Sequence, residues 1–142
     1  MKDFSFFSED ELSNIVIGVA IDVHNQLGPG LLENVYKQVL HHKLLKEGLS
    51  VEIEKSMPVQ IDEIYLDLGY KIDLLVEKKL VLELKSVKEI INAHVAQAFN
   101  YLKMENFKLG LILNFNVSQM KSGIKRVILP KRSKAVLKSF FV

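Results

Sequence analysis

The stretch YKIDLLVEKKLVLELKS, residues 70–86, decides the fold prediction because two alternating apolar runs flank a short charged loop. This pattern predicts two antiparallel strands, residues 70–76 and 80–86, joined by the three-residue loop Glu77–Lys79. The apolar face that the two strands would share consists of Ile72, Leu74, Val76, Leu80, Leu82 and Leu84.

The register of this hairpin follows from keeping that apolar face together. Residues paired across antiparallel strands lie on the same face, so the simplest register pairs Val76 with Leu80. The same register sets Asp73 directly opposite Glu83, with Lys85 close to both. Two carboxylates at this spacing repel each other unless a cation compensates their charge.

The nature of that cation follows from the donor atoms. Carboxylate oxygens beside a lysine are typical of sites for Mg²⁺ or Mn²⁺, and the lysine can orient an attacking water or stabilise charge on a phosphorane-like transition state. The alternative interpretation of Asp73, Glu83 and Lys85 is an ion-pair cluster on a solvated sheet face.

The rest of the chain predicts further helices and strands around the hairpin. Ser8 and Glu11 form a capping-box pattern before an apolar-periodic run that ends at Gly28-Pro29-Gly30. The other predicted elements are a helix over 31–47, a strand over 51–61 broken at Pro58, a helix over 88–104, and strands over 109–117 and 124–129. The order α-α-β-β-β-α-β-β predicts an α/β fold with a mixed β-sheet flanked by helices.

Composition bounds the class of protein. The chain has 142 residues, 49% hydrophobic residues, a formal net charge of +2 and no Cys. We therefore expect one domain over residues 1–142, with no disulfide, thiolate nucleophile or iron–sulfur site. No uncharged apolar run approaches the ~20 residues of a membrane span, and the acidic beginning does not resemble a secretory signal, so we expect a cytoplasmic protein without membrane contact.

Charge is distributed unevenly along the chain. Residues 103–142 carry nine Lys or Arg against Glu105 alone, whereas residues 1–36 carry one Lys against six acids. A basic end of this kind is typical of a protein that binds a polyanion such as nucleic acid, and a solvated basic tail is the alternative.

Two helical segments add polar residues that could line the same site. Gln97 and Tyr101 are spaced i,i+4, and His94 precedes Gln97 by three residues, so all three can share one helix face. The alternative is that Tyr101 is a core aromatic and His94 is exposed. Glu33 and Tyr36 form a second pair, in which Glu33 could instead complement the helix dipole.

These motifs together resemble a known family. The segment GLLENVY, residues 30–36, fits the pattern Gly30, Glu33, Tyr36 that names the GxxExxY proteins, a branch of the PD-(D/E)xK nuclease-like superfamily. The motifs that also match are Asp73, Glu83-Leu84-Lys85, Gln97 to Tyr101, and the segments 113–117 and 123–126. The resemblance covers about residues 10–130, and Ile72 stands where the Pro of the "PD" pair would be.

The resemblance implies a restriction-endonuclease-like core and a set of roles. Glu33, Asp73 and Glu83 would ligate one or two divalent ions, with the Leu84 carbonyl as a further ligand. Lys85 would position or activate the water. Gln97 and Tyr101 would hold the substrate strand or the metal-bound water.

The expected function is metal-dependent hydrolysis of phosphodiester bonds in nucleic acid, with DNA as the expected substrate and RNA as the alternative. The candidate phosphate contacts are Lys121, Lys125, Arg126, Lys131 and Arg132. The rival hypotheses are a non-catalytic nucleic-acid-binding or protein-interaction module on the same fold, and an enzyme for another phosphate-containing substrate. A homo-oligomer through the apolar ends of the chain is an open alternative.

Overall fold

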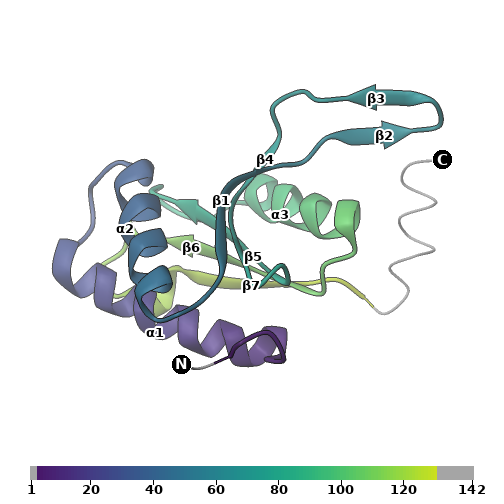
Figure 1. The fold of residues 1–142 in the computed structure, drawn as a ribbon. Helices are drawn as coiled ribbons and strands as arrows, with labels where there is room; N and C mark the ends of the chain where they lie inside the picture. Colours follow the sequence, from purple (N-terminus) through teal and green to yellow (C-terminus); the bar gives the residue numbers. More distant parts are fainter. Residues whose placement is uncertain (1–2, 131–142) are drawn as a thin grey trace.

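A computed structural model describes residues 3–130 of the chain. A mixed sheet is flanked by helices, and a separate two-stranded ribbon projects away from it (Figure 1). The elements are α1 (Glu9–Leu27), α2 (Glu33–Lys46), β1 (Val51–Ser56), β2 (Val59–Ile61), β3 (Ile64–Leu66), β4 (Lys71–Val76), β5 (Leu80–Lys85), α3 (Asn92–Glu105), β6 (Leu109–Asn114), the short 3-10 helix η1 (Met120–Gly123) and β7 (Ile124–Ile128).

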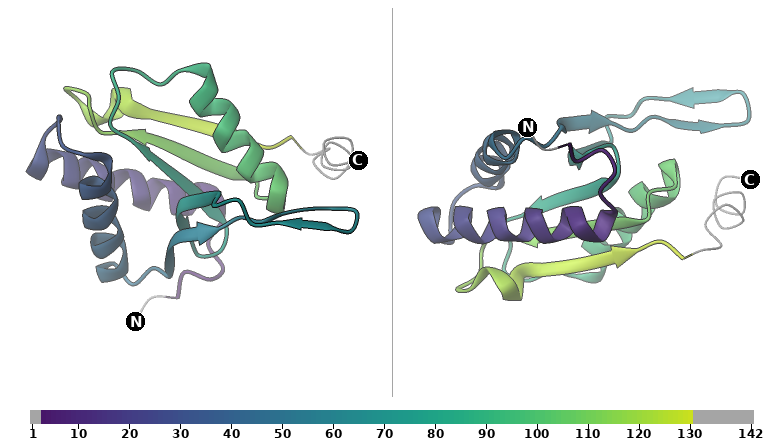
Figure 2. Two further views of the ribbon diagram at one scale, coloured as in Figure 1. Left: turned by 90° about the horizontal axis from the view of Figure 1, so that it is seen from above. Right: turned by 60° about the horizontal axis from the view of Figure 1, so that its bottom comes forward.

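The sheet has the strand order β1-β4-β5-β6-β7, in which only the β5–β6 pair is parallel. Helices α1 and α2 cover one face and α3 covers the other (Figure 2). Because β5 and β6 are parallel, the chain must cross over between them, and α3 makes that crossover. The predicted α/β class and mixed sheet are confirmed.

Helix α1 begins as its sequence predicts. The Ser8 hydroxyl accepts a hydrogen bond from the Glu11 N–H at 3.1 Å, and the Glu11 carboxylate accepts one from the Ser8 N–H at 2.9 Å. This reciprocal pair satisfies two N–H groups that the first helical turn leaves without partners. The helix ends at Gly28, whose φ of +68° is a conformation that glycine adopts without a steric cost.

The predicted register of the β4–β5 hairpin is confirmed over three pairs, Leu74 with Leu82, Leu75 with Val81, and Val76 with Leu80. The predicted apolar face is wrong at Ile72. This side chain packs with the cluster under α3, whereas Leu74 packs with the cluster under α1 and α2. The alternation of faces therefore breaks between these two residues, at Asp73.

Several predicted boundaries were wrong. The chain after Pro58 forms the β2–β3 ribbon, whose second strand was not predicted. Helix α3 begins at Asn92 instead of residue 88. The Asn114 side chain accepts a hydrogen bond from the Val87 N–H at 3.1 Å and donates one to the Val87 carbonyl at 2.9 Å, which holds this segment outside the helix.

The last predicted features lie partly outside the described residues. Lys131, Arg132 and the apolar chain end belong to residues 131–142, which the structure does not describe. Within residues 3–130, no helix combines the length and the hydropathy of a membrane span.

Candidate active site

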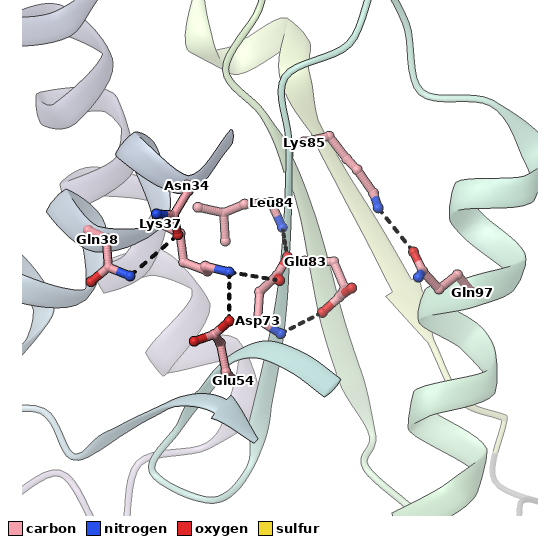
Figure 3. A network of polar contacts seen from close by, with 9 residues as sticks. All are labelled: Asn34, Lys37, Gln38, Glu54, Asp73, Glu83, Leu84, Lys85 and Gln97. Atoms are coloured by element: carbon pink, nitrogen blue, oxygen red, sulfur yellow. Dashed lines mark hydrogen bonds and ion pairs between the residues drawn. The ribbon is translucent and has the colours of Figure 1, made fainter. Parts of the chain in front are cut away.

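The site is built where β4 and β5 stop pairing (Figure 3). One pair beyond Leu74 and Leu82, the Asp73 N–H donates a hydrogen bond to Oε2 of Glu83 at 2.9 Å. The Leu84 N–H donates one to Oδ2 of Asp73 at 2.8 Å. Side-chain carboxylates thus accept hydrogen bonds from these two backbone N–H groups, and the two bonds hold the acids beside each other.

Asp73 also lies at a gap in the pairing between β4 and β1. Ile53 pairs with Leu74 and Lys55 pairs with Ile72, but the intervening residue, Glu54, has no partner in the ladder. Its φ of +52° is a left-handed conformation that is rare for a residue other than glycine. Interrupted pairing on both sides leaves the Asp73 side chain free to reach toward α2.

Tyr36 positions Glu33 at the start of α2. The Tyr36 hydroxyl donates a hydrogen bond to the Gly28 carbonyl at 2.6 Å and accepts one from the Leu31 N–H at 3.1 Å. The Tyr36 ring is fully buried and stacks on Phe115, with ring centroids 4.5 Å apart and an interplanar angle of 10°. The spacing of Glu33 and Tyr36 is therefore explained by the fold, because one residue anchors the turn that presents the other.

The same turn is fastened to the end of β5. The Ser86 hydroxyl donates a hydrogen bond to the Leu31 carbonyl at 2.6 Å. Ser86 directly follows Lys85, so the segment that carries Glu33 is tied to the strand that carries Glu83 and Lys85.

Helix α3 supplies the opposite side of the site. The Lys85 ammonium donates a hydrogen bond to Oε1 of Gln97 at 3.0 Å (Figure 3). Tyr101 is 5% exposed and packs in the apolar cluster under α3, and the negative charges of Glu83 and Asp73 act on its hydroxyl. Tyr101 is therefore both a core aromatic and a neighbour of the carboxylates.

His94 does not extend this row. Its Nδ1 accepts a hydrogen bond from the Ile91 N–H at 3.1 Å, where α3 begins. This bond satisfies a backbone donor at the helix end and gives His94 a local structural role.

Burial and like charge dominate the electrostatics. Burial, followed by the negative charge of Asp73, raises the pKa of Glu83 to about 8. Burial also raises the pKa of Asp73, against the hydrogen bond from Leu84 and the charge of Lys37. Burial and the charge of Asp73 raise the pKa of Glu33. The three carboxylates therefore share one electrostatic environment, and each is easier to protonate than an exposed acid.

Burial, followed by the charge of Glu83, also raises the pKa of the Tyr101 hydroxyl. Tyr101 is therefore a neutral hydrogen-bonding group at the edge of the site. The Tyr101 hydroxyl forms hydrogen bonds with the Gln97 side chain and the Lys71 backbone.

Sequence reasoning did not identify Lys37. Its Nζ lies 3.7 Å from Oδ1 of Asp73 and 3.6 Å from Oε1 of Glu54. The Lys37 side chain is only 11% exposed, which is unusual for a lysine. Its i,i+4 spacing from Glu33 on a predicted helix was the available signal, because it places both side chains on one helix face.

The donor set suits a hard divalent ion, because Glu33, Asp73 and Glu83 supply carboxylate oxygens close enough for their charges to act on one another. Glu83 Oε2 and Asp73 Oδ2 each accept a hydrogen bond from a backbone N–H, and Asp73 Oδ1 faces the Lys37 ammonium. Within residues 3–130, however, no group of three or more His, Asp or Glu side chains is arranged so that it could hold a metal ion.

The candidate phosphate contacts lie away from this centre. Lys125 and Arg126 are on β7, the edge strand two positions beyond β5 in the sheet, and Lys121 is in η1. Arg126 forms an ion pair with Asp10, with 3.6 Å between the charged atoms. Lys121 and Lys125 are exposed. Lys131 and Arg132 lie outside the described residues.

A mixed sheet between helices, with a carboxylate pair and a lysine at the end of its central hairpin, defines a restriction-endonuclease-like fold of the nuclease class. A family model described as the PD-(D/E)XK nuclease superfamily matches residues 10–127, and the chain belongs to that superfamily. No curated protein and no solved structure matches the chain.

Proposed function

We propose that this protein is a metal-dependent nuclease that hydrolyses phosphodiester bonds of DNA, with RNA as the alternative substrate. The observation that carries the proposal is the burial of Glu83 beside Asp73 and Glu33, which raises the pKa of Glu83 to about 8. Carboxylates held together against their own repulsion form a site that a bound cation would stabilise. Membership of the PD-(D/E)XK superfamily supports the same reaction class.

The proposed roles follow from where each group lies. Glu33, Asp73 and Glu83 would hold Mg²⁺ or Mn²⁺, which when bound neutralises phosphate charge and lowers the pKa of a coordinated water. Lys85, held by Gln97 at 3.0 Å, would orient the attacking water. The neutral Tyr101 hydroxyl would donate a hydrogen bond to the substrate strand.

Further expectations accompany this proposal. The motif of Gly30, Glu33 and Tyr36 supports the GxxExxY branch, and composition supports one domain over residues 1–142 in the cytoplasm. The exposed Lys121 and Lys125 support nucleic acid as the partner. Association of two or more copies of the chain remains an alternative to a monomer.

The experiment that tests the proposal offers purified protein linear duplex DNA, circular duplex DNA, single-stranded DNA and RNA. Each substrate is incubated with Mg²⁺, with Mn²⁺ or with EDTA. We expect cleavage only with a divalent ion, and cutting of the circle would identify endonucleolytic attack. Binding of nucleic acid without cleavage would favour the non-catalytic module. A folded protein that neither binds nor cleaves would favour the protein-interaction module.

A further inference from the structure

The feature that the proposed reaction leaves unexplained is a lysine buried on the carboxylate site. The Lys37 ammonium lies between two acids from different strands, 3.7 Å from Asp73 of β4 and 3.6 Å from Glu54 of β1 (Figure 3). The Lys37 side chain is 11% exposed and that of Asp73 is 16% exposed, whereas that of Glu54 is 50% exposed. One of the two partners is therefore inside the site and the other is at its rim.

The backbone of β1 at Glu54 departs from regular strand geometry, which places Glu54 beside Lys37. The β1–β4 register would pair Glu54 with Asp73, but that pair is missing from an otherwise regular ladder. Glu54 instead adopts a left-handed φ of +52°, a conformation that is strained for a residue other than glycine. The local strain brings a second carboxylate to the ammonium that already contacts Asp73.

Lys37 also acts on the other side of the site. It lies one helical turn after Glu33 on α2, and its positive charge lowers the pKa of both Glu33 and Asp73 against the effect of burial. Lys85 supplies positive charge from the α3 side, where Gln97 holds it. Lys37 is thus the cation on the α2 side, beside two of the three acids proposed to ligate a metal.

We propose that Lys37 is an internal counter-ion that a divalent cation displaces from Asp73 toward Glu54. This inference rests on the proposed function, because it concerns metal binding at the same carboxylates. An ammonium and a divalent ion repel each other, so they cannot both lie on the Asp73 carboxylate without a large electrostatic cost. Glu54, half exposed and already 3.6 Å from the ammonium, is the partner that receives it. Lys37 is therefore a positioning residue, because it acts through the Asp73 carboxylate and not on the substrate.

The two partners of Lys37 then have opposite effects on metal affinity. Removing the ammonium in Lys37→Met removes a competing charge, so we expect Mg²⁺ to bind about tenfold more tightly. Removing the receiving carboxylate in Glu54→Gln leaves the ammonium with Asp73 alone, so we expect Mg²⁺ to bind several-fold more weakly. The double variant is expected to behave like Lys37→Met, since Glu54 acts only through the lysine.

The test is a calorimetric titration of Mg²⁺ into wild type and the variants at a pH above 8, the value near which Glu83 titrates. Lys43→Met is the matched control, because Lys43 is also on α2 but pairs with Asp22 of α1 at 2.9 Å. Its affinity for Mg²⁺ is expected to equal that of wild type. Circular dichroism establishes that each variant is folded, and Glu54→Gln keeps the test decisive if Lys37→Met does not fold.

The outcomes separate this inference from the nuclease assignment. Opposite shifts in Lys37→Met and Glu54→Gln support the counter-ion role. Unchanged or weaker binding by Lys37→Met, or unchanged or tighter binding by Glu54→Gln, overturns it while leaving metal-dependent cleavage intact. No binding of Mg²⁺ by wild type overturns both the inference and the metal dependence of the proposed function.

Discussion

The main-chain N–H of Asp73 donates a hydrogen bond to the side chain of Glu83, 2.9 Å away, at the point where β4 and β5 separate. The carboxylate of Glu83 thus accepts a main-chain hydrogen bond one position beyond the last β4–β5 pair. The bond fixes the geometry of the acid pair, and the burial that accompanies it raises the pKa of Glu83. The bond itself opposes this rise in the pKa of Glu83, and burial outweighs it.

Stability of the metal-free protein is expected to fall as the pH rises from about 4.5 to about 8. In that interval Glu83 keeps its proton in the folded state, at a pKa of about 8, but loses it in the unfolded state, at 4.5. The folded state then binds more protons, so the free energy of unfolding decreases with pH. Asp73 and Glu33, whose pKa values are also raised, add to the same trend.

Urea denaturation in EDTA across this pH range measures the effect. Glu83→Gln is the matched variant, because its side chain is nearly isosteric and does not titrate. We expect a shallower decline in the variant, which should be more stable than wild type above pH 8. An equal decline in both proteins would contradict the buried, proton-binding state of Glu83.

The anchoring role of Tyr36 predicts a coupled loss of stability and activity in Tyr36→Phe. This change keeps the ring on Phe115 but removes the hydrogen bonds to Gly28 and Leu31, so we expect a loss of about 1–2 kcal/mol in the free energy of unfolding. The cleavage rate should also fall, because the same turn presents Glu33. Thermal denaturation and cleavage assays measure the two effects.

Tyr65→Phe is the control for that prediction. Tyr65 lies on β3 and is 62% exposed, so removing its hydroxyl should leave stability unchanged. If Tyr36→Phe matched this control in both assays, the anchoring role of the Tyr36 hydroxyl would be wrong.

Two exposed lysines, Lys121 of η1 and Lys125 of β7, predict how nucleic-acid binding depends on salt. If Lys121 and Lys125 contact phosphates, replacing each by Ala should reduce the slope of log affinity against log salt concentration by about one. The exposed Lys46, at the end of α2, is the control position and should leave the slope unchanged. Slopes identical to wild type in Lys121→Ala and Lys125→Ala would show that these two lysines do not contact nucleic-acid phosphates.

Much of the fold was predictable because local patterns agreed with the final packing. The Ser8–Glu11 capping box and the β4–β5 register depend on short-range spacing, and both are confirmed. The proximity of Asp73 and Glu83 was predictable for the same reason, because it follows from the hairpin register. Ile72 was misassigned because the alternation of faces breaks at Asp73, where two ladders are interrupted at once.

The missed features depend on tertiary contacts. Glu54 adopts a left-handed conformation without the Gly or Asn that normally indicates one. Lys37 is buried although lysines rarely are, and its partners lie on strands far along the chain. Only its spacing from Glu33 pointed to the site, and that spacing is equally typical of an exposed helix.

The most direct test of the active-site assignment compares the rate of DNA cleavage with Mg²⁺ or Mn²⁺ in wild type, Asp73→Asn, Lys85→Ala and Lys88→Ala. Lys88 is exposed, three residues after Lys85, and serves as the matched control. We expect metal-dependent cleavage by wild type and Lys88→Ala, with a loss of about a hundredfold or more in Asp73→Asn and Lys85→Ala. Equal cleavage by all four folded proteins would contradict the assignment of the active site to this hairpin.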